Sequence, residues 1–402
     1  MRQFVRGGPL DPCLLLSLLL YLVRHGDLRG YSRVLEAFWD EAQSFGLALP
    51  TEAPVSKQAF SQARKKLPAE LVRELFHTAS DAFEREHGSE FRWHGRRLLA
   101  VDGARHTIQA SEELCRTFGV PEGAHYPYLH LTTLFDVCSK VPLDVEIGRY
   151  GSDERAQLLR VMERCEPDDV LVLDKGYGAF DIFAAMIHAE VDFVCRMPAS
   201  STFTAVVDFA ASGVEDATIT LDAPSRSVLR GTEPIELRAV RVERHDGSAW
   251  IILTTLSAED FTAADIADAY TRRWNVEEYY KLLVANYFGQ GLLHAKSAQG
   301  VRQEIYAQML FVVLTRNTAA IAAQFHNVPY DELSQKAAIL AVGDHLTRIV
   351  LRRPAASARR DLERLLLRIA RAREKPRSGR SAPRRSLQPK PKWGPKGRTS
   401  GR

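Results

Sequence analysis

Two short apolar segments that each end in an aspartate constrain the fold of this chain more than any other feature. Residues 97–101 lead into Asp102, and residues 169–173 lead into Asp174. Runs of this length, rich in branched apolar residues, are typical of buried strands. Either aspartate, taken alone, is typical of a turn residue or a helix-cap residue. Two strands that each deliver an aspartate to one edge of a sheet indicate a site, because ligands gather at strand ends.

Patterns elsewhere divide the chain into segments of different character. Apolar residues recur at spacings of three and four in residues 9–90, and the pattern becomes helical again from 262 to 370. Strand-like runs that alternate with helices in between indicate a mixed α/β fold. The predicted order is a helical N-terminal domain (1–95), an α/β core (96–198), a β-rich insertion (199–250), the continued core (251–345), a C-terminal helix (346–370) and a tail (371–402).

The formal charge of +4 is unevenly distributed along the chain. Residues 371–402 contain twelve Lys and Arg against one acid, Glu374, so this segment has a net charge of +11 and residues 1–370 have −7. Proline, glycine and serine in the same segment oppose regular structure, which predicts a flexible cationic arm. Phosphate contacts by such an arm would hold nucleic acid without reading its sequence.

The longest apolar run, residues 14–23, is shorter than the roughly 20 residues that span a bilayer. No small-residue cleavage site follows this run, so we expect a buried helix and neither a membrane anchor nor a signal peptide. The five cysteines are scattered and never form a CxxC pair, which favours a reducing compartment and no structural zinc. These features predict a cytoplasmic protein that does not associate with a membrane.

A third candidate acid lies on a segment with helical spacing. Tyr270, Arg273, Glu277 and Lys281 are three, four and four residues apart, so a helix places them on one face. An ordinary amphipathic helix with an Arg273 to Glu277 ion pair has the same spacing. Glu278 competes with Glu277, but it is rotated by about 100° from the face of Arg273.

Three carboxylates from separate elements suit hard divalent cations such as Mg²⁺, which prefer oxygen ligands. Two such ions about 4 Å apart activate the attacking oxygen and stabilise the leaving oxygen of a phosphoryl displacement. This is the chemistry of nucleases and strand-transfer enzymes. Arg273 and Lys281 would then face nucleic-acid phosphate.

A basic segment in the N-terminal region is a second candidate for phosphate contacts. Residues 56–66 place Lys57, Arg64 and Lys65 on a predicted helix, and a basic helix can lie against phosphates. A solvated helix face explains the same residues equally well.

The residues at the three acids resemble those of bacterial insertion-sequence transposases of the DDE class. The motifs that carry the resemblance are Val101-Asp102-Gly103, Leu173-Asp174-Lys175-Gly176-Tyr177 and the segment from Tyr270 to Lys281. The third motif is similar to the Tyr-Arg-Glu-Lys signature of one group, in which Tyr270, Arg273 and Glu277 match in identity and interval. The final Lys of the signature falls at Val284, and Lys281 is the nearest substitute.

The resemblance implies a ribonuclease H-like mixed sheet flanked by helices, with the β-rich insertion before the helix of the glutamate. It implies that Asp102, Asp174 and Glu277 bind two Mg²⁺ or Mn²⁺ ions. Water would cut the ends of the insertion sequence, and the freed 3′-hydroxyls would attack target DNA. The residues expected to contact DNA are Tyr270, Arg273, Lys281, Lys175, Lys57, Arg64 and Lys65.

The implied partner is double-stranded DNA, at transposon ends and target, in a bacterial cytoplasm at the nucleoid. Pairing of two ends implies at least a homodimer in the DNA complex. No phosphate-loop motif occurs, so we expect no nucleotide cofactor. Two other functions remain open: a metal-dependent DNA nuclease on the same fold, and a catalytically inactive DNA-binding relative that acts as a repressor.

Overall fold

The computed structural model describes residues 10–24, 30–225, 227–244, 248–273, 293–350 and 355–374. Glu277, Glu278, Lys281 and Val284, and the basic tail from residue 375 onward, lie outside the described residues. The chain forms two compact units. The helical unit contains residues 1–76, 106–129 and 284–402, and the sheet unit contains residues 77–105 and 130–283.

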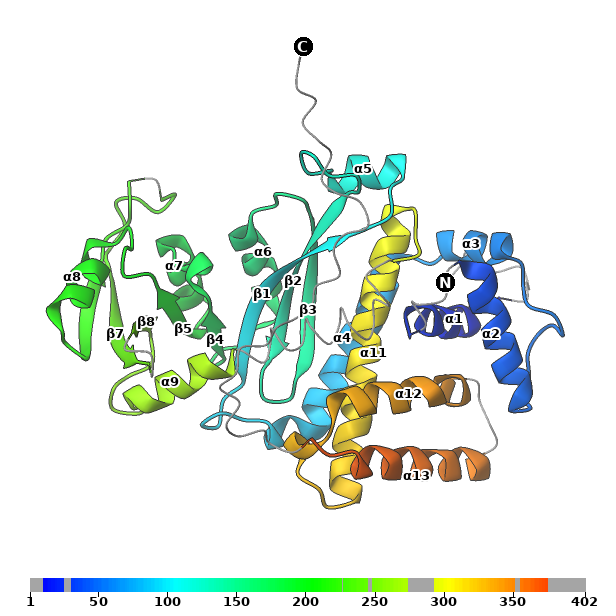
Figure 1. Cartoon of the computed structure of the whole chain (residues 1–402). Helices are drawn as coiled ribbons and strands as arrows, with labels where there is room; N and C mark the ends of the chain where they lie inside the picture. The colour runs from blue at the N-terminus through cyan, green and yellow to red at the C-terminus, as the bar shows by residue number, and fades with distance from the viewer. Residues whose placement is uncertain are drawn as a thin grey trace, which may run out of the picture. The chain divides into compact units, whose positions relative to one another are not determined.

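One eight-stranded sheet, in the order β3-β2-β1-β4-β5-β8-β7-β6, is the centre of the fold (Figure 1). Its strands are β1 (Leu98–Thr107), β2 (Tyr128–Asp136), β3 (Val141–Arg149), β4 (Val170–Leu173), β5 (Asp192–Met197), β6 (Asp216–Leu221), β7 (Ile235–Glu243) and β8 (Ala249–Thr254). β4 pairs with β1 and β5 in parallel, whereas the pairs β5–β8, β8–β7 and β7–β6 are antiparallel. The predicted mixed α/β fold is therefore confirmed.

Helices of the sheet unit flank this sheet. They are α6 (Glu154–Val161), α7 (Phe180–His188), α8 (Thr204–Ser212) and α9 (Ala263–Arg272), with the short 3₁₀ helices η2 (Gly88–Glu90), η3 (Met162–Arg164) and η4 (Lys175–Tyr177). α6 contacts β3, α7 contacts β5, and α8 contacts β6 and β7. α9 contacts β4, β5 and β7. All four residues of β4 are buried, which explains why this strand reads as an unbroken apolar run.

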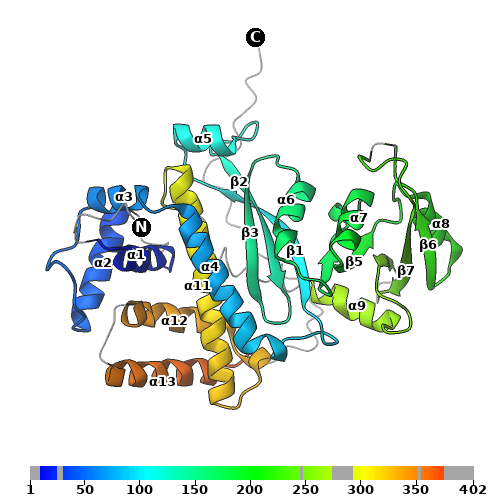
Figure 2. The same ribbon diagram turned by 180° about the vertical axis from the view of Figure 1, so that it is seen from behind.

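Helices make up most of the helical unit. They are α1 (Pro12–Arg24), α2 (Tyr31–Ser44), α3 (Lys57–Lys65), the first part of α4 (Ala69–His87), α5 (Glu112–Phe118), α11 (Ala298–Phe325), α12 (Gln335–Val350) and α13 (Ala355–Arg371), with the 3₁₀ helix η6 (Tyr330–Glu332). α11 contacts α1, α12 and α13, and Figure 2 shows α11, α12 and α13 side by side from behind. This grouping differs from the predicted linear domains, because α1 buries its apolar residues beside α11 and α12.

The apolar run at residues 14–23 is a buried part of α1, as predicted. Among the described residues, α11 is the helix long and apolar enough to cross a bilayer. Most of the residues of α11 are buried inside the helical unit, as in the core helix of a globular protein. All five cysteines are free thiols.

Two predicted segments differ from the structure in their extent. β1 does not end at Asp102 but continues to Thr107, because β2 borders it along the sheet. The predicted β-rich insertion contains β6 and β7, and these strands extend the main sheet through β8. The insertion also contains α8, which the sequence pattern did not predict.

Candidate active site

Asp102 lies in β1, and Asp174 directly follows the neighbouring parallel strand β4. The two strands pair from Leu98 with Val170 to Ala100 with Val172. Each aspartate comes two residues after the last of these pairs, where β4 ends. Continuation of the same register would place the two carboxylates on one face of the sheet, since side chains alternate across a sheet. Both residues are half-buried.

A buried ion pair fixes this register at the other end of the two strands. Arg97 precedes β1, Asp169 precedes β4, and their side chains form a bidentate pair with Nε to Oδ1 at 2.7 Å and Nη2 to Oδ2 at 2.6 Å. Burial lowers the pKa of Arg97, but its hydrogen bonds and charge interaction with Asp169 outweigh burial and raise that pKa. The planar guanidinium therefore clamps the two aspartate-bearing strands five residues before their carboxylates.

Arg196 adds a charged residue from a third strand. β4 and β5 pair Val170 with Asp192 and Leu173 with Cys195, and Asp174 and Arg196 are the residues that follow this last pair. Asp174 and Arg196 both influence the pKa of Tyr270, so the carboxylate and the guanidinium lie near the same side chain. Sequence reasoning missed Arg196, because no local spacing relates it to Asp174.

α9 brings Tyr270 and Arg273 to these residues. Burial raises the pKa of Tyr270, the charge of Arg273 opposes this rise, and the carboxylate of Asp174 adds to it. Arg196 also lowers the pKa of Tyr270. The guanidinium carbon of Arg273 lies 5.7 Å from the centre of the Tyr270 ring. The structure therefore brings two predicted residues of the third motif together with the predicted Asp174.

Trp250 of β8 completes an aromatic and cationic cluster around Tyr270. Its ring meets the Tyr270 ring edge-on at 4.8 Å between centres. Arg196 lies 5.8 Å and Arg244 lies 5.1 Å from the centre of the Trp250 ring, as cation–π contacts.

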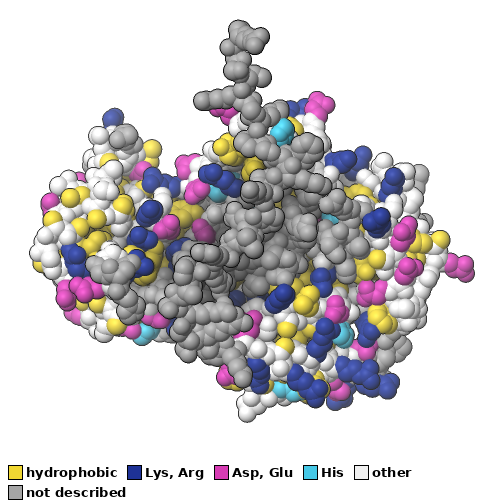
Figure 3. Space-filling model, viewed as in Figure 1, with side chains coloured by type: hydrophobic (Ala, Val, Ile, Leu, Met, Phe, Trp, Pro, Cys, Tyr) yellow, Lys and Arg dark blue, Asp and Glu magenta, His cyan; other side chains and the backbone are white. Residues whose placement is uncertain are grey.

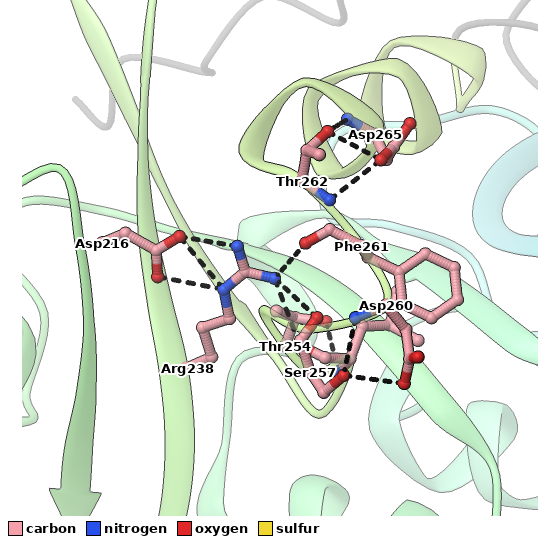
Figure 4. A network of polar contacts seen from close by, with 9 residues as sticks. Asp216, Arg238, Thr254, Ser257, Asp260, Phe261, Thr262 and Asp265 are labelled. Carbon is pink, nitrogen blue, oxygen red and sulfur yellow. Dashed lines mark hydrogen bonds and ion pairs between the residues drawn. The ribbon is translucent and has the colours of Figure 1, made fainter.

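The connection from β8 to α9 is anchored by Arg238 of β7 (Figure 4). Its guanidinium donates to both carboxylate oxygens of Asp216 and to the main-chain carbonyls of Ser257, at 3.0 Å, and Phe261, at 2.7 Å. Thr262 and Asp265 then form a capping box at the start of α9. These contacts hold the helix that carries Tyr270 and Arg273.

The glycine after Asp102 is required by a close approach. A Cβ at Gly103 would lie 2.7 Å from Nε2 of His130 and 3.7 Å from the carboxyl carbon of Glu154. The His130 ring is buried on β2, and its Nε2 lies 3.4 Å from Glu154 Oε1. Burial lowers the pKa of His130. The group that Gly103 accommodates is therefore the imidazole of His130, on the face of β1 opposite the Asp102 side chain.

The loop after Asp174 presents cations. Asp174 precedes η4, and its carbonyl accepts a hydrogen bond from Tyr177 N at 3.0 Å. Lys175 is exposed on this turn. Nε of Arg155, in the first turn of α6, donates to the carbonyl of Gly176 at 3.1 Å. Arg155 was not among the predicted site residues, since its proximity depends on how α6 meets the loop.

Mg²⁺ or Mn²⁺ fits the donor set that the two strands present. Asp102 and Asp174 supply carboxylate oxygens, which are the ligands that these ions prefer. The described residues contain no group of three His, Cys, Asp or Glu that could hold a metal ion. The predicted third ligand, Glu277, and the predicted DNA contact Lys281 follow α9 and lie outside the described residues.

The basic helix of the N-terminal region is α3. Ser56 caps it by accepting a hydrogen bond from Ala59 N at 3.1 Å, and Lys57 and Lys65 are exposed on it. Arg64 is a correction to the predicted DNA-binding set, because its side chain is buried inside the helical unit. Its guanidinium donates to Glu304 Oε1 at 2.8 Å and Gln303 Oε1 at 3.0 Å, so it anchors α3 to α11.

Comparisons with known proteins agree with the motifs. A family model described as the transposase DDE domain matches residues 93–314. The chain is 22% identical over 282 residues to the transposase InsG for insertion sequence element IS4 of Escherichia coli (strain K12), covering 67% of this chain and 63% of that protein. It is 23% identical over 159 residues to the putative transposase InsZ of the same organism, covering 38% of this chain and 53% of that protein.

The fold is also similar to a solved structure, the piggyBac transposase synaptic complex with hairpin DNA. The superposition covers 91% of this chain and 79% of the piggyBac chain, with a TM-score of 0.43 and 10% sequence identity.

The chain spans a little under two thirds of the length of InsG and about half the length of InsZ. The family model covers more than half of the chain, including Asp102, Asp174, Tyr270 and Arg273. The chain belongs to the DDE transposase family of insertion-sequence elements.

Proposed function

We propose that this protein is a DNA transposase that cuts the ends of its insertion sequence and joins the 3′-hydroxyl ends to target DNA. The observation that supports the proposal is that Asp102 and Asp174 each come two residues after the last paired residues of two neighbouring parallel strands. Two carboxylates that share one face at this point would repel each other unless cations lie between them and share their charge. The family supports DNA as the substrate.

We assign the metal ligands to Asp102, Asp174 and Glu277. When bound, two Mg²⁺ or Mn²⁺ ions would activate the attacking oxygen and stabilise the leaving oxygen of the phosphodiester. The carboxylates hold their place because Arg97 and Asp169 fix the strand register. A ribonuclease H-like identity for the core is part of this proposal.

Cations on the same face would hold the phosphates of the DNA end. Arg196 and Arg273 lie around Tyr270 beside Asp174, and Lys175 is exposed on the adjoining turn. Lys281, one helical turn after Glu277 in sequence, would add to this set. A guanidinium suits phosphate because its planar fork donates two parallel hydrogen bonds.

We assign recognition of the transposon end to the exposed face of α3. Gln58, Gln62, Lys57 and Lys65 are exposed on this helix, and α3 contains no acidic residue. Lysine contacts phosphate, whereas glutamine can make two hydrogen bonds to adenine in the major groove. Arg64 holds α3 on α11, and Gln58 and Gln62 lie about 120° and 160° around the helix axis from it. Pairing of two ends would require a homodimer in the DNA complex.

The test incubates the protein with linear end DNA, a supercoiled target plasmid and Mg²⁺. Joined product supports a transposase, whereas cleavage without joining would identify a nuclease and overturn the strand-transfer step. Binding without cleavage in either Mg²⁺ or Mn²⁺ would identify an inactive DNA-binding relative.

The variant Asp102→Asn links the activity to the site. We expect it to bind end DNA normally but to lose both cleavage and joining. The matched control is Glu163→Gln, which removes one exposed acid from η3. Full end cleavage by Asp102→Asn in Mg²⁺ would contradict the assignment.

A further inference from the structure

We propose that α13 carries a sequence-independent binding stripe for duplex DNA phosphates, formed by Arg360, Arg364 and Arg371. This inference rests on the proposed function only in taking DNA as the ligand. It concerns a surface of the helical unit that contains none of the catalytic carboxylates.

The three arginines share the most exposed face of α13. They are four and seven residues apart, which places them within about 40° of one another around the helix axis. All three are exposed, whereas Leu365 and Ile369 on the opposite side are buried. The first and last arginines are eleven residue steps apart, or roughly 16 Å along the axis at 1.5 Å per step.

The other cations of this region are already neutralised by carboxylates. Arg359 pairs with Glu363 at 3.0 Å, Arg368 with Asp344 at 2.8 Å, and Arg373 with Glu332 at 2.9 Å. The remaining acid of α13, Asp361, lies 3.8 Å from Arg348. Within the described part of the chain, no ion pair involves the three arginines of the stripe, so their positive charge faces solvent.

Figure 3 shows Lys and Arg side chains gathered at the lower right, over α12 and α13. Successive phosphates of one DNA strand advance by about 3.4 Å along the duplex axis, so a stripe of this length can follow several of them. A duplex backbone is therefore the polyanion that matches the stripe in length and in charge.

A membrane surface fits the stripe less well than DNA does. Basic helices that bind bilayers insert their apolar face between the lipids. The apolar face of α13 is buried, with Leu365, Leu366 and Ile369 almost fully inaccessible, and α13 contacts α11 and α12. Leu362 and Leu367 are exposed, but they lie about 140° apart around the helix axis and form no continuous apolar face. The helix therefore offers a row of charge and only two separated leucines, which favours a phosphate backbone in water.

The experiment measures DNA affinity by fluorescence anisotropy between about 50 and 200 mM salt, with two unrelated duplexes, one of which carries the transposon end. The test variant is the triple Arg360→Gln, Arg364→Gln, Arg371→Gln. The matched control is the triple Arg359→Gln, Arg368→Gln, Arg373→Gln, which removes the same charge from paired positions of the same segment. Thermal unfolding establishes that both variants are folded.

We expect the test variant to bind both duplexes more weakly. The slope of log affinity against log salt should fall by about 2 to 3, because each phosphate contact contributes about 0.9. The control should change the slope by less than about 1. An equal change in the two triples, or a change confined to the transposon-end duplex, would overturn the proposal.

Two further measurements separate this inference from its alternatives. Vesicles of phosphatidylserine and phosphatidylcholine should bind wild type and test variant equally. A loss of vesicle binding with unchanged DNA binding would overturn the inference in favour of a membrane surface. The wild type could cut and join DNA while the test variant keeps the wild-type slope of log affinity against log salt. This result would refute the stripe but leave the proposed function unchanged. Wild type that binds no DNA would refute both.

Discussion

At the residue scale, the site depends on one glycine. Gly103→Ala would place a methyl group 2.7 Å from Nε2 of His130, beside Asp102. The strand or the imidazole must move, so we expect a loss of stability of about 1 to 3 kcal/mol and slower end cleavage. Urea unfolding and single-turnover cleavage measure the two effects.

The control for this substitution is Gly176→Ala in the turn after Asp174. A Cβ at Gly176 would meet no atom within 4 Å, so the free energy of unfolding should change little. Equal destabilisation by the two substitutions would show that the His130 contact does not require a glycine.

A buried carboxyl on β2 predicts a pH dependence of stability. Burial raises the pKa of Asp136 to about 6, although the main-chain N–H groups of Ser139 and Cys138 oppose this rise. The folded state therefore retains a proton on Asp136 that the unfolded state releases near pH 3.8. The contribution of this carboxyl to the free energy of unfolding is fully present below pH 3.8 and is lost as the pH rises to about 6.

We expect Asp136→Asn to remove that loss. The advantage of the variant in free energy of unfolding over wild type should grow between pH 4 and 6 and then level off, at about 3 kcal/mol for two pKa units. Chemical unfolding at a series of pH values measures it. A difference that is constant over this range would contradict a raised pKa.

At the element scale, Arg97 and Asp169 fix the register of the two strands that lead to the proposed catalytic aspartates. Asp169→Asn leaves a buried guanidinium without its charge partner, which costs about 3 to 5 kcal/mol. Asp168→Asn is the matched control, since the adjacent Asp168 side chain is 85% exposed and lies 4.0 Å from Arg96. Surface pairs contribute about 1 kcal/mol or less. Urea unfolding that showed equal costs would contradict the clamp.

Local sequence predicted the strands and helices because their apolar patterns reflect burial. The runs before Asp102 and Asp174 are buried strands, and the spacing in residues 9–90 corresponds to α1 to α4. Registers across strands are not local, so Arg196 could not be found by spacing. Arg64 reads as a surface cation of α3, and only its contact with Glu304, 240 residues away, reveals a buried anchor.

At the scale of the whole molecule, positive charge is concentrated toward one end of the sequence. The basic segment that begins at residue 371 continues from α13, whose Arg360, Arg364 and Arg371 form no ion pair with another described residue. The linear domain order could not anticipate that residues 1–76 and 284–402 form one unit, because that grouping depends on α1 contacting α11 and α12.

Deletion of residues 375–402 tests the contribution of the basic tail. It removes ten Lys and Arg and no acid, so DNA affinity should fall and its dependence on salt should flatten. The position of end cleavage should stay the same, since the carboxylates lie elsewhere in the chain. Anisotropy titrations and mapping of the cut ends measure both properties, and an unchanged salt slope would show that the tail makes no phosphate contacts.

The central claim is that Asp102 and Asp174, on one face of the sheet, bind the metal ions that activate DNA cleavage. The most direct measurement is the Mg²⁺-dependent rate of end cleavage by Asp174→Asn, with end binding measured on the same preparation and Glu163→Gln as control. Loss of residues that merely orient metal ligands costs about 10 to 100-fold. The account predicts a larger loss for Asp174→Asn, with DNA binding retained and the control at the wild-type rate. Cleavage by Asp174→Asn at the wild-type rate would contradict it.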